Sequence, residues 1–236
     1  MQAVRTDKGE IRDMNVKQVS EHIWSLKAWM IIPVHVWAVV GKDGVTLVDA
    51  GVPWMAKNIT RLLDGLQAGP LQRILLTHGH ADHVGSLKKL LEAKQVPVYA
   101  HSREIPYAEG RTPYPKKDKV SAGVPEGTLT ALPEEASGAL ATIGELKPYF
   151  TPGHSPGHVV YYHEGDDVLL AGDLFNSRKG KVLQARFTPD PDEAMRSSAI
   201  LKELRPAKLE VCHGDTVLQP ADQWDALMKP YAGDNN

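Results

Sequence analysis

Apolar residues in the first hundred positions alternate between short β-type runs and stretches with helical spacing. Two valine-rich runs, 34–42 and 44–51, flank Lys42-Asp43-Gly44, a sequence typical of a tight hairpin turn. The segment 53–69 has apolar positions three and four apart and stops at Gly69-Pro70, which predicts a helix. The remaining elements predicted in this half are a strand at 73–77, a helix at 84–95 and a strand at 96–101.

The alternation then breaks and resumes. Residues 105–137 are rich in proline, glycine and lysine, with weak periodicity, which predicts a long surface loop or lid. Beyond it we expect strands at 147–153, 158–165, 167–173 and 208–214, and helices at 191–204 and from about residue 220. Two strand-rich halves, each followed by helices, predict a single α/β domain over 1–236. Two packed sheets with helices outside would place the sheet-end loops at one rim.

Composition and charge exclude some classes of partner. The chain has 236 residues, 42% apolar and 24% charged, and a net charge of −2, so nothing favours nucleic acid as a partner. The cluster Lys116, Lys117 and Lys119 is short and is interpreted as a solvated loop. Residues 1–13 contain no apolar stretch, and no apolar run reaches the ~18 residues needed to span a bilayer. We therefore expect a cytoplasmic protein with no membrane partner. Its single cysteine, Cys212, excludes an intramolecular disulfide.

The segment LLTHGHADHVG, residues 75–85, concentrates metal-ligand residue types. It contains His78, His80, Asp82 and His83. Because helical positions two apart point about 200° from each other, one helix face cannot present all four. A loop between a strand and a helix lets them converge. Imidazole and carboxylate groups are zinc ligands, so the segment predicts part of a metal site, the alternative being a polar loop that happens to be histidine-rich.

Further candidate ligands follow other predicted strands. His154 lies in TPGHSPGH, Asp173 ends the run DVLLAGD, and His213 ends LEVCHG. An aspartate directly after a buried strand is costly without a partner. Taken singly, each of these residues fits a capping or structural role equally well. Together with the loop they give seven ligands, enough for two metals.

The motifs THGHADH, TPGHSPGH, AGD and CHG, in this order, resemble those of the metallo-β-lactamase superfamily, and most closely its glyoxalase II-like and lactonase-like hydrolases. The similarity covers about residues 15–215. It implies a four-layer αββα sandwich with a dinuclear centre at the shared rim of two sheets. By this resemblance one metal is held by His78, His80 and His154, the other by Asp82, His83 and His213, and Asp173 bridges the two.

Other residues receive weaker assignments. The resemblance implies that Asp49 orients the ligand loop, a role in which a carboxylate fixes histidine tautomers; a simple turn aspartate is the alternative. His35 and Asn176 are candidates for the substrate pocket, and His158 is a candidate for supporting the ligands. We expect at least two of Trp29, Met30 and Ile31 to pack in the core, with an apolar wall of the cleft as the alternative. His22, His101 and His163 are interpreted as structural or surface residues.

Two divalent ions sharing a carboxylate and a water lower the pKa of that water and polarise a carbonyl or phosphoryl oxygen. We therefore expect a metal-dependent hydrolase that uses a metal-bridging hydroxide on a small-molecule ester, thioester or lactone, with Asp82 as a proton shuttle. The two ions are expected to be zinc, although the ligand types also suit iron, manganese or cobalt. The oligomeric state is left open.

Departures from the subfamilies leave the substrate open. Asn176 stands where lactonases carry a tyrosine, and Tyr107 or Tyr114 of the lid are candidate replacements. Only 23 residues follow His213, too few for the glutathione-binding domain of glyoxalase II. Cys212 precedes His213 rather than occupying a ligand position, which argues against cysteine-ligand β-lactamases. The alternative functions are a mononuclear iron dioxygenase acting on persulfides, a phosphodiester hydrolase and a non-catalytic metal-binding scaffold.

Overall fold

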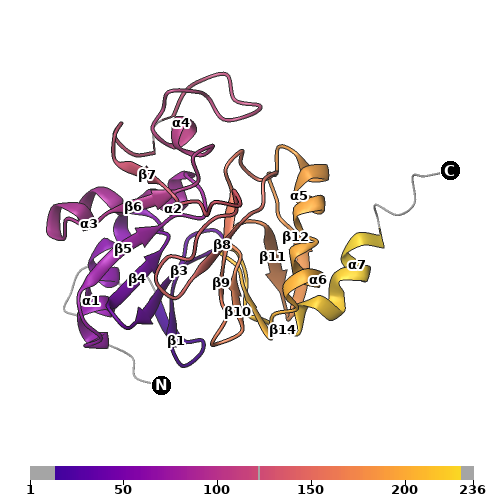
Figure 1. The fold of residues 1–236 in the computed structure, drawn as a ribbon, viewed down its shortest axis with the longest axis horizontal. Helices are drawn as coiled ribbons and strands as arrows, with labels where there is room; N and C mark the ends of the chain where they lie inside the picture. Colours follow the sequence, from indigo (N-terminus) through magenta and orange to yellow (C-terminus); the bar gives the residue numbers. More distant parts are fainter. Residues whose placement is uncertain (1–13, 122, 230–236) are drawn as a thin grey trace.

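Two β-sheets packed face to face form the centre of the molecule, and helices cover their outer faces (Figure 1). The computed structural model describes residues 14–121 and 123–229. Helices α1 and α3 lie on one side and α5, α6 and α7 on the other. The predicted four-layer αββα sandwich is confirmed by this arrangement.

The first sheet has seven strands in the order β1-β2-β3-β4-β5-β6-β7. Strands β1 to β4 are antiparallel neighbours, and β4 to β7 run parallel. Their bounds are Met14–Gln18 (β1), Ile23–Trp29 (β2), Pro33–Gly41 (β3), Gly44–Val48 (β4), Leu71–Leu75 (β5), Val98–Ala100 (β6) and Leu129–Ala131 (β7).

The second sheet has five strands in the order β14-β13-β10-β9-β8, in which β10 and β13 are parallel. They are Lys147–Phe150 (β8), Val159–His163 (β9), Val168–Leu170 (β10), Lys208–Glu210 (β13) and Val217–Leu218 (β14). A separate hairpin joins Phe175–Arg178 (β11) and Lys181–Gln184 (β12).

The helices are short and mostly amphipathic. They are Ala56–Leu66 (α1), Ala81–Val84 (α2), Leu87–Ala93 (α3), Ile105–Ala108 (α4), Pro191–Ser197 (α5), Ile200–Leu204 (α6) and Trp224–Met228 (α7), with 3-10 turns at Pro53–Met55 (η1) and Pro220–Gln223 (η2).

Residue alternation along β9 explains why the second sheet needs cover on both faces. Val159 and Tyr161 belong to the cluster between the sheets, whereas Val160 packs with Ile200 and Leu201 under the outer helices. Successive strand residues point to opposite faces, so both faces of this strand are apolar. The buried Tyr161 also donates a hydrogen bond to the Leu76 carbonyl, 2.8 Å away, and so ties the sheets together beside the rim.

Several predicted elements differ from the structure. The sequence pattern misses β1, β2, β14 and the β11–β12 hairpin. Strand β1 is largely polar and exposed, and the hairpin sends only a few isolated apolar residues, such as Phe175 and Val182, into the core. The helices predicted at 84–95 and 191–204 are each interrupted, at 85–86 and 198–199. Helix α1 ends at Leu66, where Gln67 adopts a left-handed conformation, three residues before the predicted stop. The expected lid at 105–137 contains α4 and β7.

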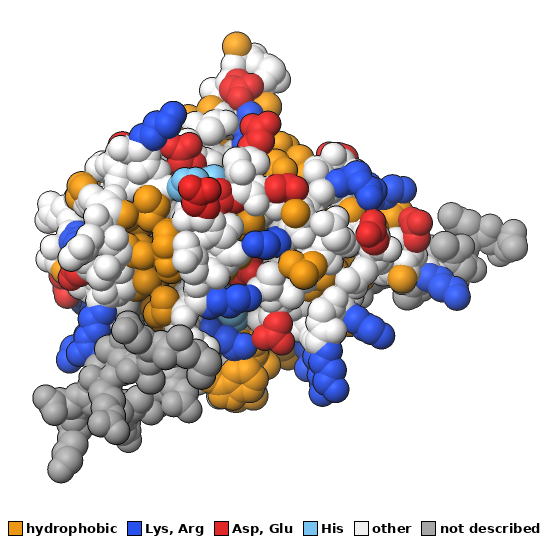
Figure 2. Space-filling view, turned by 90° about the horizontal axis from the view of Figure 1, so that it is seen from below, with side chains coloured by type: hydrophobic (Ala, Val, Ile, Leu, Met, Phe, Trp, Pro, Cys, Tyr) orange, Lys and Arg blue, Asp and Glu red, His pale blue; other side chains and the backbone are white. Residues whose placement is uncertain are grey.

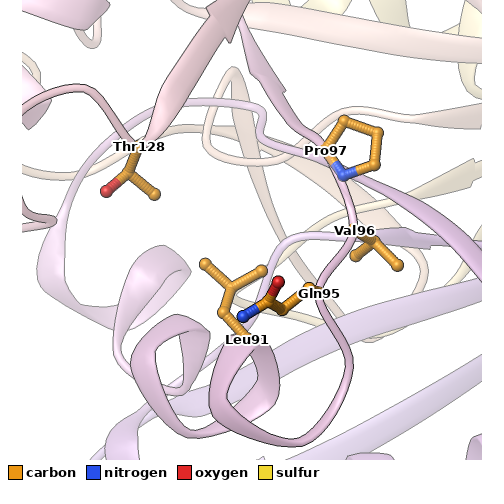
Figure 3. A pocket seen from close by; sticks show the side chains of 5 residues that line it. All are labelled: Leu91, Gln95, Val96, Pro97 and Thr128. Atoms are coloured by element: carbon orange, nitrogen blue, oxygen red, sulfur yellow. The ribbon is translucent and has the colours of Figure 1, made fainter.

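The surface adds little to the candidate chemistry. On the face shown in Figure 2, basic and acidic side chains are interspersed and form no continuous basic field. A shallow depression beside α3 is lined by Leu91, Gln95, Val96, Pro97 and Thr128, which include no titratable side chain and no histidine, cysteine or carboxylate (Figure 3). Within the described residues, no helix has the length and apolar character needed to cross a membrane. The prediction about residues 1–13 lies outside the described part of the chain.

Candidate metal centre

Loops that follow strands of both sheets bring the predicted ligands to one rim. His78 comes three residues after β5, and Asp173 and His213 come three residues after the parallel strands β10 and β13. His154 lies in the loop between β8 and β9. Carboxyl ends of neighbouring parallel strands share one edge of a sheet. The Val159 amide joins the two rims directly by donating to the Thr77 carbonyl, 2.9 Å away.

The first group of ligand atoms comes from His78, His80 and His154. The His80 Nδ1 atom lies 2.9 Å from His78 Nε2 and 3.1 Å from His154 Nε2. The side chains of His78 and His154 are buried, and His80 is half-buried. Two ligand atoms bound to one tetrahedral zinc at about 2.1 Å are separated by about 3.4 Å. The three imidazoles are therefore spaced as a single ion requires, within a few tenths of an ångström.

The second group contains Asp82, His83 and His213, and Asp173 stands between the two groups. His213 Nε2 is 3.2 Å from an oxygen of Asp82 and 3.2 Å from Asp173 Oδ2. Asp173 Oδ2 is also 3.5 Å from Nε2 of His154, a member of the first group. Its other oxygen, Oδ1, lies 3.5 Å from His83 Nε2. One carboxylate thus faces ligands of both groups.

Two orphaned polar atoms indicate that the cluster fits a metal. His83 Nε2 and Asp173 Oδ1 are buried, and neither has a hydrogen-bond partner. Buried polar atoms without partners are rare because each costs free energy. These two atoms face each other at 3.5 Å, the separation of two ligands on one ion. A divalent cation between them would satisfy both.

Asp49 holds the ligand loop in place through hydrogen bonds. Its carboxylate is fully buried and accepts hydrogen bonds from the Thr77 amide and the Thr77 hydroxyl, both at 2.8 Å. It also lies 2.7 Å from His83 Nδ1. With the Nδ1 proton donated to this carboxylate, Nε2 of His83 points toward Asp173, where it could bind a metal after losing its own proton. Asp49 has a φ of 59°, a left-handed conformation that few residues other than Gly, Asn and Asp adopt readily.

Backbone groups orient two more residues of the centre. His213 Nδ1 donates to the Pro33 carbonyl, 2.8 Å away, so its Nε2 points to the two aspartates. His158, a candidate for supporting the ligands, is buried and accepts the Asp173 amide hydrogen on Nε2 at 3.2 Å. Such bonds fix the tautomer and the orientation of a ligand.

The pKa shifts of three ligand residues favour the protonation states that metal binding requires. Burial lowers the pKa of His154 to about 4 and also lowers the pKa of His78, so these imidazoles are neutral near pH 7. Burial alone raises the pKa of a carboxyl group, but His83 and His213 lower the pKa of Asp82 to about 2. Metal ligands must be neutral imidazoles and ionised carboxylates. His78, His154 and Asp82 are therefore already in the metal-binding form.

The other predicted site residues lie around this centre. Asn176 is the second residue of β11, three residues after Asp173, and its buried Oδ1 has no hydrogen-bond partner. His35 is buried on β3, with its Nδ1 2.7 Å from the Ser25 hydroxyl. Their roles in substrate binding remain predictions. His22, His101 and His163 lie apart from the seven ligand residues: His101 stacks on Phe150, and His22 and His163 stack on each other.

His35 predicts a pH dependence of stability. Burial, with the nearby charge of Lys27, lowers the pKa of His35 from 6.5 to about 4. The unfolded chain therefore binds a proton at His35 more readily than the folded protein does. The free energy of unfolding is unaffected by this residue above pH 6.5 and falls as the pH drops from 6.5 toward 4. This loss amounts to about 3 kcal/mol. Urea unfolding of chelator-treated protein at pH 7 and pH 4 should show a smaller loss for His35→Gln than for wild type. Equal losses would contradict this role.

Three exposed residues correct one expectation. Trp29, Met30 and Ile31 are exposed by 56%, 46% and 88%, so the expectation that at least two pack in the core is wrong. They form the tip of the β2–β3 hairpin, where Lys27 Nζ lies 5.6 Å from the centre of the Trp29 ring. Trp29 pairs with Pro33, and Pro33 accepts the hydrogen bond from His213. The tip therefore lies at the mouth of the centre, where the alternative, an apolar wall of the cleft, is retained as a proposal.

The contact between the lid and the metal centre involves Tyr114, a candidate from the sequence, and Glu104, which no sequence pattern indicates. Tyr114 stacks edge-on against His80, with ring centroids 4.7 Å apart, and its hydroxyl donates to Glu104, 2.7 Å away. The Gly123 amide bonds to the Ala108 carbonyl and holds the far side of the lid. Glu104 is fully buried although it lies in an unpatterned stretch, HSREIPY.

Cys212 lies closer to the metal ligands than the sequence indicates. Its sulfur is near enough to the ligand atoms of Asp82, His83 and His213 for the four to share one ion.

Gly79 is required for the lid to dock. A Cβ at this position would collide with Ala108 and the Tyr114 hydroxyl. We expect Gly79→Ala to lower the free energy of unfolding by about 1–3 kcal/mol and to speed tryptic cleavage at the lid lysines, because an undocked backbone fits a protease more readily. Limited proteolysis followed by mass spectrometry measures this. The control is Gly65→Ala on α1, where a Cβ meets nothing within 4 Å. Identical cleavage rates for the two variants would show that the lid does not depend on this contact.

Comparisons with known proteins agree with this architecture. Residues 30–213 match the family model described as the metallo-beta-lactamase superfamily. A probable metallo-hydrolase of Bacillus subtilis, YybB, is 38% identical over 211 residues, which cover 87% of this chain and 93% of that protein.

Solved structures show the same fold. A metallo-beta-lactamase from Pontibacter korlensis has a TM-score of 0.72 at 19% identity, covering 92% of this chain and 99% of that one. TTHA1623, solved in a di-iron-bound form, has a TM-score of 0.64 at 26% identity, covering 86% of this chain and 97% of that one. With the family model spanning well over half of its length, the chain belongs to the metallo-beta-lactamase superfamily.

Proposed function

We propose that this protein is a dinuclear metal-dependent hydrolase acting on an ester, thioester or lactone, in the glyoxalase II-like and lactonase-like branch of its superfamily. The observation that carries the proposal is the position of Asp173, whose two oxygens face His154 of the first group and His83 of the second. A carboxylate in that place suits a bridge between two ions. The similarity to a probable metallo-hydrolase supports the reaction class, and the di-iron form of TTHA1623 supports two ions.

Some residues of the centre hold the ligands in place, and one, Asp82, is proposed to transfer a proton. When bound, two divalent ions lower the pKa of a shared water and polarise a substrate carbonyl. Asp49 and the Pro33 carbonyl hold His83 and His213 with their Nε2 atoms inward. The side chain of Asp82 is 28% exposed and is the ligand carboxylate nearest to solvent. Its carboxylate is ionised near pH 7, and its exposed position makes it the group that would take up a proton at the centre and pass it to the leaving group.

Apolar side chains at the mouth of the centre favour a substrate with an apolar part. The hairpin tip of Trp29, Met30 and Ile31 stands beside His213, as described above. In the loop between β12 and α5, Phe187 is 90% exposed and precedes Thr188, whose hydroxyl lies 3.5 Å from His154 Nδ1. Exposed apolar groups around a site mark a binding surface. An acyl or alkyl group of an ester or lactone would cover them.

Turnover by the reconstituted protein tests the proposed function. Protein stripped by chelation and reloaded with zinc, iron, manganese or cobalt is assayed against lactones, thioesters, β-lactams and phosphodiesters. We expect hydrolysis of at least one carbonyl ester class, abolished by chelation and restored by metal, with kcat/KM rising along a series of longer acyl chains. Hydrolysis of phosphodiesters alone, or oxygen uptake with persulfides by a one-iron form, would overturn the proposal.

A further inference from the structure

A single buried carboxylate connects three segments around the first group of ligands. Glu104 follows β6, and its side chain is completely buried. One oxygen, Oε1, accepts the Gly79 amide at 2.9 Å and the Tyr114 hydroxyl at 2.7 Å. The other, Oε2, accepts the Ser155 hydroxyl and the Gly157 amide, each at 2.8 Å. Both oxygens are thus used twice, by donors from three different loops.

The positions of the donors connect Glu104 to the ligands. Gly79 lies between His78 and His80, so its amide fixes the backbone of the first ligand loop. Ser155 and Gly157 follow His154 in the second ligand loop. These two loops come from different sheets, and His80 and His154 must approach within about 3.4 Å to share one ion. The carboxylate spans the distance between their backbones.

The fourth donor extends the connection to the lid. The Tyr114 ring stacks edge-on against His80 while its hydroxyl binds Oε1 of Glu104. The hydroxyl is therefore occupied by Glu104 and is not directed at a substrate carbonyl in this structure. Tyr114 is a poor candidate for the tyrosine that Asn176 replaces, and a good one for a latch that positions His80.

Burying the carboxylate of Glu104 costs free energy unless hydrogen bonds or an opposite charge compensate for the loss of water. The four donors are neutral, and among the described residues no lysine or arginine bonds to Glu104. A buried charge is tolerated where hydrogen bonds surround it completely. A neutral amide of the same shape cannot replace it, because its NH2 group would confront two of the donors.

We propose that Glu104 is a positioning residue that sets the spacing of His80 and His154 for the first metal and couples that spacing to the docked lid. The proposal rests on the proposed metal centre, but it concerns metal affinity and geometry rather than the reaction. It predicts that the affinity for the first metal falls when any one of the hydrogen bonds to Glu104 is removed. It also predicts that metal in the first group protects the lid.

The test measures cobalt binding in a His213→Ala background, in which only the first group is complete. In this background Glu104→Gln is compared with Glu109→Gln, a control that alters another buried carboxylate, one bonded to Arg111 and the Leu129 amide. Chelator competition gives the affinity, and the visible d–d spectrum of bound cobalt reports its geometry. We expect tenfold or greater weakening and a changed spectrum for Glu104→Gln only. Cobalt should also slow tryptic cleavage of the lid in the background protein, but not in Glu104→Gln.

Affinity and spectrum within twofold of the control would overturn the proposal. If Glu104→Gln does not fold, Ser155→Ala and Tyr114→Phe each remove one donor and decide the question. Smaller losses of affinity in both variants support the connection, and unchanged affinity in both contradicts it. Because no substrate is used, the absence of esterase activity would not affect these results. Failure of the unmodified protein to bind cobalt would instead contradict the proposed function.

Discussion

Asp173→Asn is expected to reduce bound metal from about two ions to one or fewer per chain and to lower kcat/KM by about 1000-fold or more. The asparagine keeps the shape of the side chain but removes the negative charge that faces His83, His154 and His213. One of its two terminal atoms becomes an NH2 group, which cannot bind a metal. The remaining oxygen could bind one ion, but the side chain could no longer bridge two.

Metal content by mass spectrometry and turnover on the same preparation measure this effect. Asp222→Asn is the matched control, because Asp222 is exposed and contacts only Arg205 through a surface ion pair at 3.2 Å. Surface pairs of this kind contribute little to stability. An Asp173→Asn protein that retains two ions and full activity would show that this carboxylate is not the bridge.

Asp49→Ala is expected to lower the free energy of unfolding by about 3–5 kcal/mol and to lower the metal affinity by about 10- to 100-fold. The alanine leaves the Thr77 amide, the Thr77 hydroxyl and the His83 ring nitrogen without their common acceptor. It also places an ordinary side chain at a φ of 59°. His83 would be free to change tautomer or to rotate away from Asp173.

Two further variants separate these causes. Asp49→Asn tolerates the left-handed backbone and retains one acceptor oxygen, so we expect a smaller loss of stability but a similar loss of metal affinity. Asp64→Ala, which removes an exposed carboxylate paired with Lys94, should change neither quantity measurably. Denaturant unfolding and chelator competition measure both. Wild-type metal affinity in Asp49→Ala would contradict the proposed orientation of His83.

The ligand residues were predictable because their positions carry two signals at once. Each is a residue type suited to metals, and His78, Asp173 and His213 also follow buried apolar runs, where polar groups need partners. The hairpin at Lys42–Gly44 and the strands β3 to β5 were predictable for a similar reason, since periodicity and turn residues agree. The two packed sheets were predictable from the two strand-rich halves of the sequence, whereas no pattern in it specified the pairing order of the strands.

The misses concern contacts that no local pattern encodes. Glu104 stands in a polar stretch and is buried only because donors from distant loops surround it. Trp29, Met30 and Ile31 have the composition of a core segment but sit at a hairpin tip, where the chain turns away from the sheet. Strand β1 is polar and mostly exposed, and its structure depends on pairing with β2 along its whole length.

The central claim is that this centre holds two ions bridged by Asp173. Anomalous diffraction from crystals of the zinc- or manganese-loaded protein tests it directly, because each ion gives its own peak. The account predicts two peaks about 3.5–4 Å apart, one among His78, His80 and His154, the other among Asp82, His83 and His213, with the Asp173 carboxylate between them. A single peak at saturating metal, or two peaks without Asp173 between them, would contradict it.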